Sequence, residues 1–105
     1  MSDQNVKTRQ KIILTSYDST LAGKINSGCE HCHILLDTSL AGFTVTLPDV
    51  TATMQRELIF KNIGTKTATV KCINGQYMDN VTTKTIAALG SLSLWPDLQK
   101  TWWVI

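Results

Sequence analysis

Hydrophobic and polar residues alternate in short stretches along most of this chain. Residues 43–47 read Phe-Thr-Val-Thr-Leu, and residues 67–73 read Thr-Ala-Thr-Val-Lys-Cys-Ile. A period of two places the apolar side chains on one face of a strand and the polar ones on the other. Both stretches are therefore predicted to be β-strands with one buried face.

Further apolar stretches are bounded by residues that favour turns. They predict strands at residues 11–17, 30–36, 57–61, 76–81 and 83–89. Asn74-Gly75 is a strong signal for a tight turn, and Asn62 and Gly64 suit a turn with positive φ. Residues 21–28 are predicted to form a loop, and residues 50–55 a loop or a single helical turn.

The stretch from Gly90 to Ile105 reads GSLSLWPDLQKTWWVI and holds all three tryptophans. Two apolar runs flank a polar corner, which predicts a β-hairpin whose last strand belongs to the core. Trp102 and Trp103 are adjacent, so in a strand they point to opposite faces. One is expected in the core, and the other at a subunit contact or on the surface.

Together these stretches predict an all-β fold, a small antiparallel β-sandwich of jelly-roll type with about eight short strands. Threonine is abundant, helix formers are scarce, and no internal repeat is visible. The expected division is a polar attachment arm with a possible first strand over residues 1–21, followed by the sandwich module over residues 22–105.

Composition excludes several classes of function. The net charge is +2 with scattered lysines, which is too weak a pattern for nucleic-acid binding. No apolar run approaches the roughly 20 residues that span a bilayer, so membrane insertion is not expected. No export signal is apparent at the start, so the three cysteines are expected to be reduced thiols.

Three motifs resemble one family. Residues 34–49, ILLDTSLAGFTVTLPD, resemble the segment ILVDtsaGavTVTLPd found in small β-domains of bacteriophage tail and fibre proteins. Residues 58–70, LIFKNIGTKTATV, resemble the pairing ytIKNiGtgtvTI that follows it, and the end of the chain resembles nGetIdG…gsvtLvsdgtnWyvI. The chain departs from the family pattern at Met78, Asn80 and Trp95-Pro96, positions that affect loop shapes.

This resemblance implies a virion structural protein of a bacteriophage, located in the virion after assembly in the host cytoplasm. It implies a homotrimer in a fibre, a tail or a head decoration, whose arm attaches to a larger phage virion protein. Host attachment through a surface glycan is a further implied role. The alternative from another class is a carbohydrate-binding β-sandwich module without a virion role. The candidate interface or ligand residues are Tyr77, Trp95, Trp102 and Trp103.

Both histidines lie in the run Cys29-Glu30-His31-Cys32-His33. On a strand, Cys29, His31 and His33 share one face while Cys32 points the other way. One chain cannot wrap this run around zinc, because structural zinc sites use two separated ligand pairs. By resemblance to trimeric phage fibres with a His-x-His pair, His31 and His33 are the candidate ligands of an axial transition metal. The alternative is a solvated strand face with the cysteines packed as small apolar residues.

No catalytic constellation is apparent. Cys29 and His31 lack a third orienting group, the aspartates mostly occupy predicted turns, and there is no glycine-rich phosphate loop. The protein is therefore predicted not to be an enzyme. Apart from the candidate axial metal, no cofactor is predicted.

Overall fold

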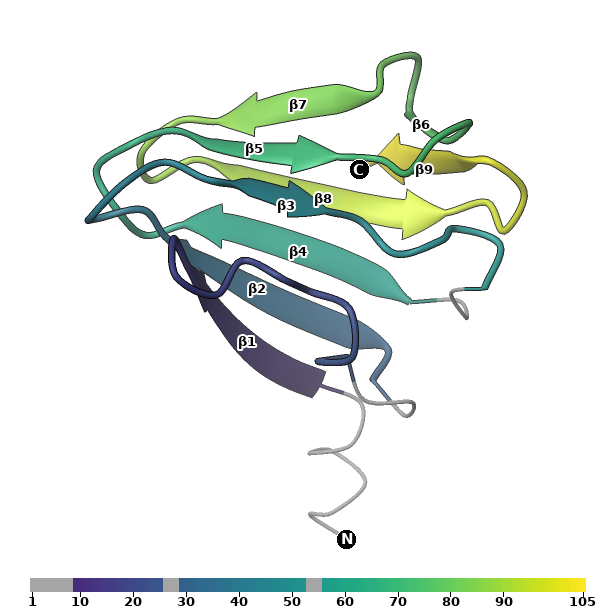
Figure 1. Ribbon diagram of the computed structural model, residues 1–105. Coiled ribbons are helices and arrows are strands. Elements are labelled where there is room, and N and C mark those ends of the chain that lie inside the picture. The colour runs from purple at the N-terminus through teal and green to yellow at the C-terminus, as the bar shows by residue number, and fades with distance from the viewer. Residues whose placement is uncertain (1–8, 26–28, 53–55) are drawn as a thin grey trace, which may run out of the picture.

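The computed structural model describes residues 9–25, 29–52 and 56–105, which form nine strands and no helix (Figure 1). The strands are β1 (Arg9–Thr15), β2 (His31–Asp37), β3 (Thr44–Thr46), β4 (Glu57–Asn62), β5 (Ala68–Lys71), β6 (Tyr77–Met78), β7 (Thr83–Ile86), β8 (Ser91–Pro96) and β9 (Thr101–Val104). The predicted all-β class is confirmed. No helix among these residues is long and apolar enough to cross a membrane.

The strands form two sheets. The larger sheet has six strands in the order β1-β2-β4-β8-β9-β6, and the smaller has three in the order β3-β5-β7. Figure 1 shows the chain passing repeatedly from one sheet to the other, with β3 connecting β2 to β4 and β5 following β4. Several of these passages place a strand beside an earlier one, for example β4 beside β2, β5 beside β3 and β7 beside β5.

Much of the pairing is parallel, which corrects the predicted antiparallel jelly-roll sandwich. In the larger sheet β1 pairs with β2 and β2 with β4, so that His31 faces Glu57, 26 positions later in the chain. In the smaller sheet β3 pairs with β5, and Thr44 faces Thr69, 25 positions later. Parallel neighbours need a long crossover connection. The connection from β2 to β4 passes through β3 of the smaller sheet, and the connection from β3 to β5 passes through β4 of the larger one. The first strands therefore stack as the coils of a short β-solenoid, before β8 and β9 complete the larger sheet with antiparallel pairs.

The core lies between the two sheets and follows from the period-two alternation. In residues 43–47, Val45 and Leu47 are fully buried and Phe43 packs against the core, which confirms the predicted face. The largest completely buried side chains are Trp102, Phe60, Leu14, Leu21, Ile34, Leu36, Leu47, Leu58, Met78, Leu94, Val45 and Val50. Burial of these side chains, at about 1.5–3 kcal/mol for each large one, is the main favourable term in the stability of the fold.

Two turn predictions have different outcomes. Gly75 has a φ of 85°, and the N–H of Gln76 donates to the carbonyl of Ile73 at 3.1 Å, so the Asn74-Gly75 turn is confirmed. The expected positive φ at Asn62 and Gly64 is wrong, because neither is among the described residues with positive φ. Asn62 instead ends β4 with a buried side chain.

The described part of the predicted arm contains β1, which pairs with β2 along its whole length. Residues 1–8 lie outside the described residues, as do residues 53–55 within the predicted loop at 50–55. The division into an arm at 1–21 and a module at 22–105 therefore stays a prediction.

Candidate functional site

The outer face of the six-stranded sheet, which points away from the core, carries a pair of exposed tryptophans. Trp95 of β8 and Trp103 of β9 are direct cross-strand partners and are 41% and 45% exposed. Ile105 follows on the same hairpin and is 63% exposed. Side chains at facing positions of antiparallel strands are close neighbours, so the two indoles lie side by side on this face and are called the tryptophan pair below.

The adjacent Trp102 points the other way and is fully buried. This split between Trp102 and Trp103 is the one expected of neighbouring strand residues. Trp102 therefore packs in the core of the protomer, while Tyr77, Trp95 and Trp103 remain accessible among the four predicted contact residues.

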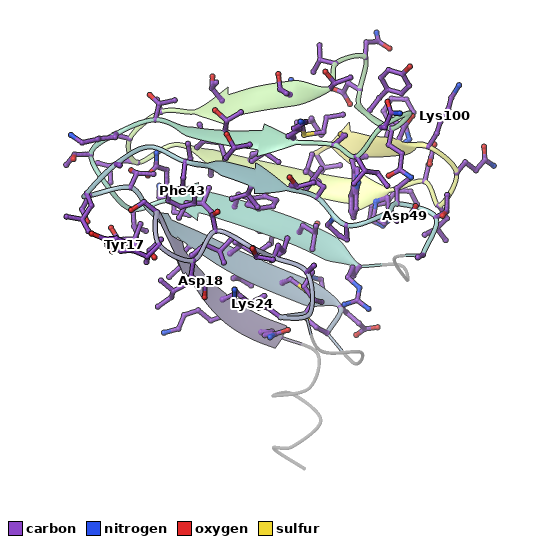
Figure 2. The ribbon with its side chains drawn as sticks, viewed as in Figure 1. Tyr17, Asp18, Lys24, Phe43, Asp49 and Lys100 are labelled. Carbon is purple, nitrogen blue, oxygen red and sulfur yellow. The ribbon has the colours of Figure 1, made fainter. Side chains whose placement is uncertain are left out.

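Beside the tryptophan pair lies an open groove of about 440 Å³. Its lining residues come from the two corners around β6 and β9, which pair in parallel: Tyr77, Asp79, Asn80, Asp97, Lys100, Thr101 and Trp103. Lys100 marks this end of the molecule in Figure 2. The groove thus combines two exposed aromatic rings with carboxylate, amide and ammonium groups.

Hydrogen bonds fix the shape of this groove. One oxygen of Asp97, Oδ1, accepts from the backbone N–H groups of Gln99, Lys100 and Thr101 at 2.8, 3.0 and 3.0 Å. The bond from Thr101 is the main reason that the pKa of Asp97 is lowered from its ordinary value. Oδ1 of Asp79 accepts from the N–H of Val104 at 3.1 Å. Both carboxylates therefore brace the loops beside the rings.

The two histidines also lie on the outer face, both exposed, at the start of β2. His31 Nδ1 is 3.4 Å from Oε1 of Glu57, and by register Arg9 and Lys11 of β1 lie beside His31 and His33. Within residues 9–25, 29–52 and 56–105, no three His, Cys, Asp or Glu side chains group closely enough to hold a metal ion. One protomer thus offers two imidazoles, and a shared axial metal stays a prediction.

The cysteines of the same run point into the core. Cys29 is only 2% exposed and Cys32 is completely buried, with their Sγ atoms 2.6 Å apart. The predicted placement of Cys29 on the face of His31 is wrong, because β2 begins at His31 and the strand alternation does not extend back to Cys29. Both thiols instead pack with apolar side chains.

Sequence reasoning identified the aromatic residues of this region but not the groove. Asp79, Asn80, Asp97 and Lys100 line it together only because β6 pairs with β9. The two corners are separated in sequence by β7 and β8, and no local pattern relates them.

No family model, curated protein or solved structure matches the chain.

Proposed function

We propose that the protein is a structural component of a bacteriophage virion that assembles as a homotrimer through the outer face of its larger sheet. The observation that carries this proposal is the exposed tryptophan pair on a face that no other described element covers. Large aromatic side chains are enriched at protein interfaces. Two adjacent indoles exposed to water are unfavourable in a monomer, and a subunit contact would remove them from water.

The sheet edges support the same proposal. The larger sheet ends at β1 and β6, and the smaller at β3 and β7. Open edges of this kind favour pairing with further strands, and proteins commonly cover them by symmetric association. In the proposed virion, residues 1–21 attach the trimer to a larger virion protein as part of a fibre, a tail or a head decoration.

Light scattering after size exclusion tests the trimer. The full chain is expected to elute as three copies, and the double change Trp95→Ser and Trp103→Ser should give a folded monomer. The matched control is Tyr17→Ser, which removes an aromatic that is 87% exposed in the turn after β1 and should leave the trimer intact. A monomeric full chain contradicts the proposal.

The proposed trimer also provides the setting for an axial transition metal. Three copies of His31 and His33 supply six imidazoles, a suitable ligand set for iron, nickel or zinc. Metal analysis of purified trimer should then find about one ion per three chains, removed by a chelator with loss of thermal stability. If the purified trimer contains no metal, the metal site is rejected but the trimer is not. The same conclusion follows if the His31→Ala and His33→Ala double variant is as stable as the unmodified protein.

A second candidate function is recognition of a saccharide by the groove. The specific observation is that Tyr77 and Trp103 lie beside Asp79, Asn80 and Lys100, which pairs apolar ring faces with hydrogen-bonding groups. Sugars present both apolar and polar faces, which this combination suits. In a virion, this recognition would serve host attachment. Without a virion role, the protein would be a carbohydrate-binding module.

Glycan-array binding tests this second function. Tyr77→Ala should abolish the signal while the oligomeric state stays unchanged, because Tyr77 lies outside the tryptophan pair. Tyr17→Ala is the matched control, since Tyr17 is exposed and lies neither in the groove nor in the tryptophan pair. Absence of any glycan signal from the unmodified protein rejects recognition and leaves the architectural role.

A further inference from the structure

The fold brings two of the three thiols together inside the core. Cys29 immediately precedes β2, and Cys32 is the second residue of that strand. Their Sγ atoms are 2.6 Å apart, whereas a disulfide bond is about 2.05 Å long. Forming the bond requires only a small displacement of two side chains that already point at one another.

The third thiol differs. Cys72 follows β5, is 3% exposed and makes no sulfur–sulfur contact within the described residues. All three cysteines are free thiols in this structure. The chain therefore contains one preorganised pair and one isolated cysteine that serves as an internal reference.

We propose that Cys29 and Cys32 form a dithiol–disulfide site that a low-molecular-weight disulfide oxidises reversibly, while Cys72 remains a thiol. This inference is independent of the proposed function. It rests on the short distance between the two sulfur atoms and on the position of Cys32 in β2.

The reaction is a thiol–disulfide exchange in two steps. One protein thiolate attacks a sulfur of the small disulfide, forms a mixed disulfide and expels one small thiolate. The second protein thiolate attacks the protein sulfur of that mixed disulfide, forms the Cys29–Cys32 bond and expels the other small thiolate. The protein pair loses two electrons and two protons, and the small disulfide is reduced to two thiols.

Burial makes this exchange slow, because Cys29 is only 2% exposed and Cys32 is completely buried. Reagents reach the pair only when the fold opens locally around the two buried thiols.

The test uses the full folded chain and oxidised glutathione as the probe. After equilibration and denaturing quench, thiol titration should fall from three thiols per chain to one, with a mass loss of two hydrogens. Cys72→Ser should still lose two thiols. Cys29→Ser and Cys32→Ser should each fail to form the intramolecular bond. Three remaining thiols, or glutathione adducts that never resolve, overturn the proposal.

A second measurement separates the role of the fold from the short spacing in sequence. The equilibrium constant for glutathione oxidation of the pair is measured in the folded Cys72→Ser protein and again in concentrated urea. Because the fold holds the two thiols together, the constant should be about tenfold or more higher in the folded protein than in urea. Each equilibrium is reached once from the oxidised protein and once from the reduced protein. An equal or smaller constant in the folded protein overturns the claim that the fold favours the Cys29–Cys32 disulfide.

Discussion

At the end of β4, the side chain of Asn62 is completely buried and hydrogen-bonded at both its oxygen and its nitrogen. Its Nδ2 donates to the carbonyls of Lys66 and Ile86 at 2.6 and 2.9 Å. Its Oδ1 accepts from Thr38 Oγ1 at 2.8 Å and from the N–H of Gly64 at 3.1 Å. One amide thus joins the corner after β2, the turn after β4 and the end of β7.

Replacing Asn62 tests the importance of this corner. Asn62→Ala should lower the free energy of unfolding by about 2–4 kcal/mol, because several buried backbone groups lose their partners. Urea denaturation of the purified variant measures the change. The exposed Asn80→Ala is the control and should stay within about 0.5 kcal/mol of the unmodified protein. Equal stability of the two variants contradicts the assigned role.

The corner also explains Gly64. A Cβ at this position would overlap the backbone N and the Oγ1 of Thr38, and would lie 2.6 Å from the N of Ser39. Gly64 is therefore required for close approach of two backbones, and not for positive φ. The Asn-Ile-Gly sequence predicts a bend. The reason that glycine is needed there is the close approach of Thr38 and Ser39, which only the structure shows.

Four aspartates brace turns and make stability depend on pH. The pKa values of Asp18, Asp37, Asp49 and Asp97 are lowered, mainly by side-chain hydrogen bonds from Lys24, Ser39 and Thr51 to the first three and a backbone bond from Thr101 to the last. In the pH range below about 4 the unfolded chain binds more protons than the folded one. Stability contributed by these carboxylates is therefore present above that range and is lost as the pH falls through the folded pKa values.

Asp97→Asn should reduce this acid sensitivity. Its free energy of unfolding is expected to change less between pH 5 and pH 2.5 than that of the unmodified protein, because one linked carboxylate is gone. Denaturation curves across this range measure the slope. Glu30→Gln alters an exposed carboxylate outside these turns and is the control. An Asp97→Asn slope as steep as that of the control contradicts the linkage.

At the scale of elements, the closing hairpin was the most predictable part of the fold. β8 and β9 pair in antiparallel fashion around a corner at residues 97–100, as the sequence pattern predicted. The last strand lies inside the larger sheet, between β8 and β6. Its two tryptophans consequently belong to different environments.

Trp102→Ala and Trp103→Ala should fail in different ways. Trp102→Ala removes a completely buried indole and should cost about 3–5 kcal/mol of folding stability. Trp103→Ala should fold normally and weaken trimer formation. Thermal unfolding and light scattering distinguish the two effects. If both variants remain folded trimers, the assignment of the hairpin is wrong.

Strand positions could be predicted because alternation is local, whereas strand partners could not. The parallel neighbours Cys32 and Leu58 are both buried but differ in type, and Leu36 lies beside the polar Asn62. Stacked coils therefore share a pattern of burial without sharing a sequence repeat. The same limit applies to the candidate site. The split between Trp102 and Trp103 follows from adjacency, but the groove depends on tertiary placement. The Cys29–Cys32 contact is local, and it was missed because the strand alternation does not extend back to Cys29.

At the scale of the whole molecule, folding and assembly are predicted to be coupled. If the trimer forms through the tryptophan pair, the thermal midpoint should rise with protein concentration, because association stabilises only folded chains. Scanning calorimetry over about a hundredfold range of concentration measures this effect.

The variants used for light scattering provide the comparison. The Trp95→Ser and Trp103→Ser double variant should have a midpoint that is independent of concentration, and Tyr17→Ser should behave like the unmodified protein. A constant midpoint for the unmodified trimer would show that the interface does not contribute to stability.

The parallel register of β2 and β4 has a consequence for how such a molecule changes in length. His31 and Glu57 occupy equivalent places on successive coils, so the 26 residues from one to the other form a unit that starts and ends at the same point of the cross-section. Duplication of that unit would insert a new coil between existing ones and extend the larger sheet by about 4.8 Å, while the closing hairpin and its outer face remained unchanged. A tandem copy of this stretch would thus lengthen the stack of coils while the closing hairpin stays the same.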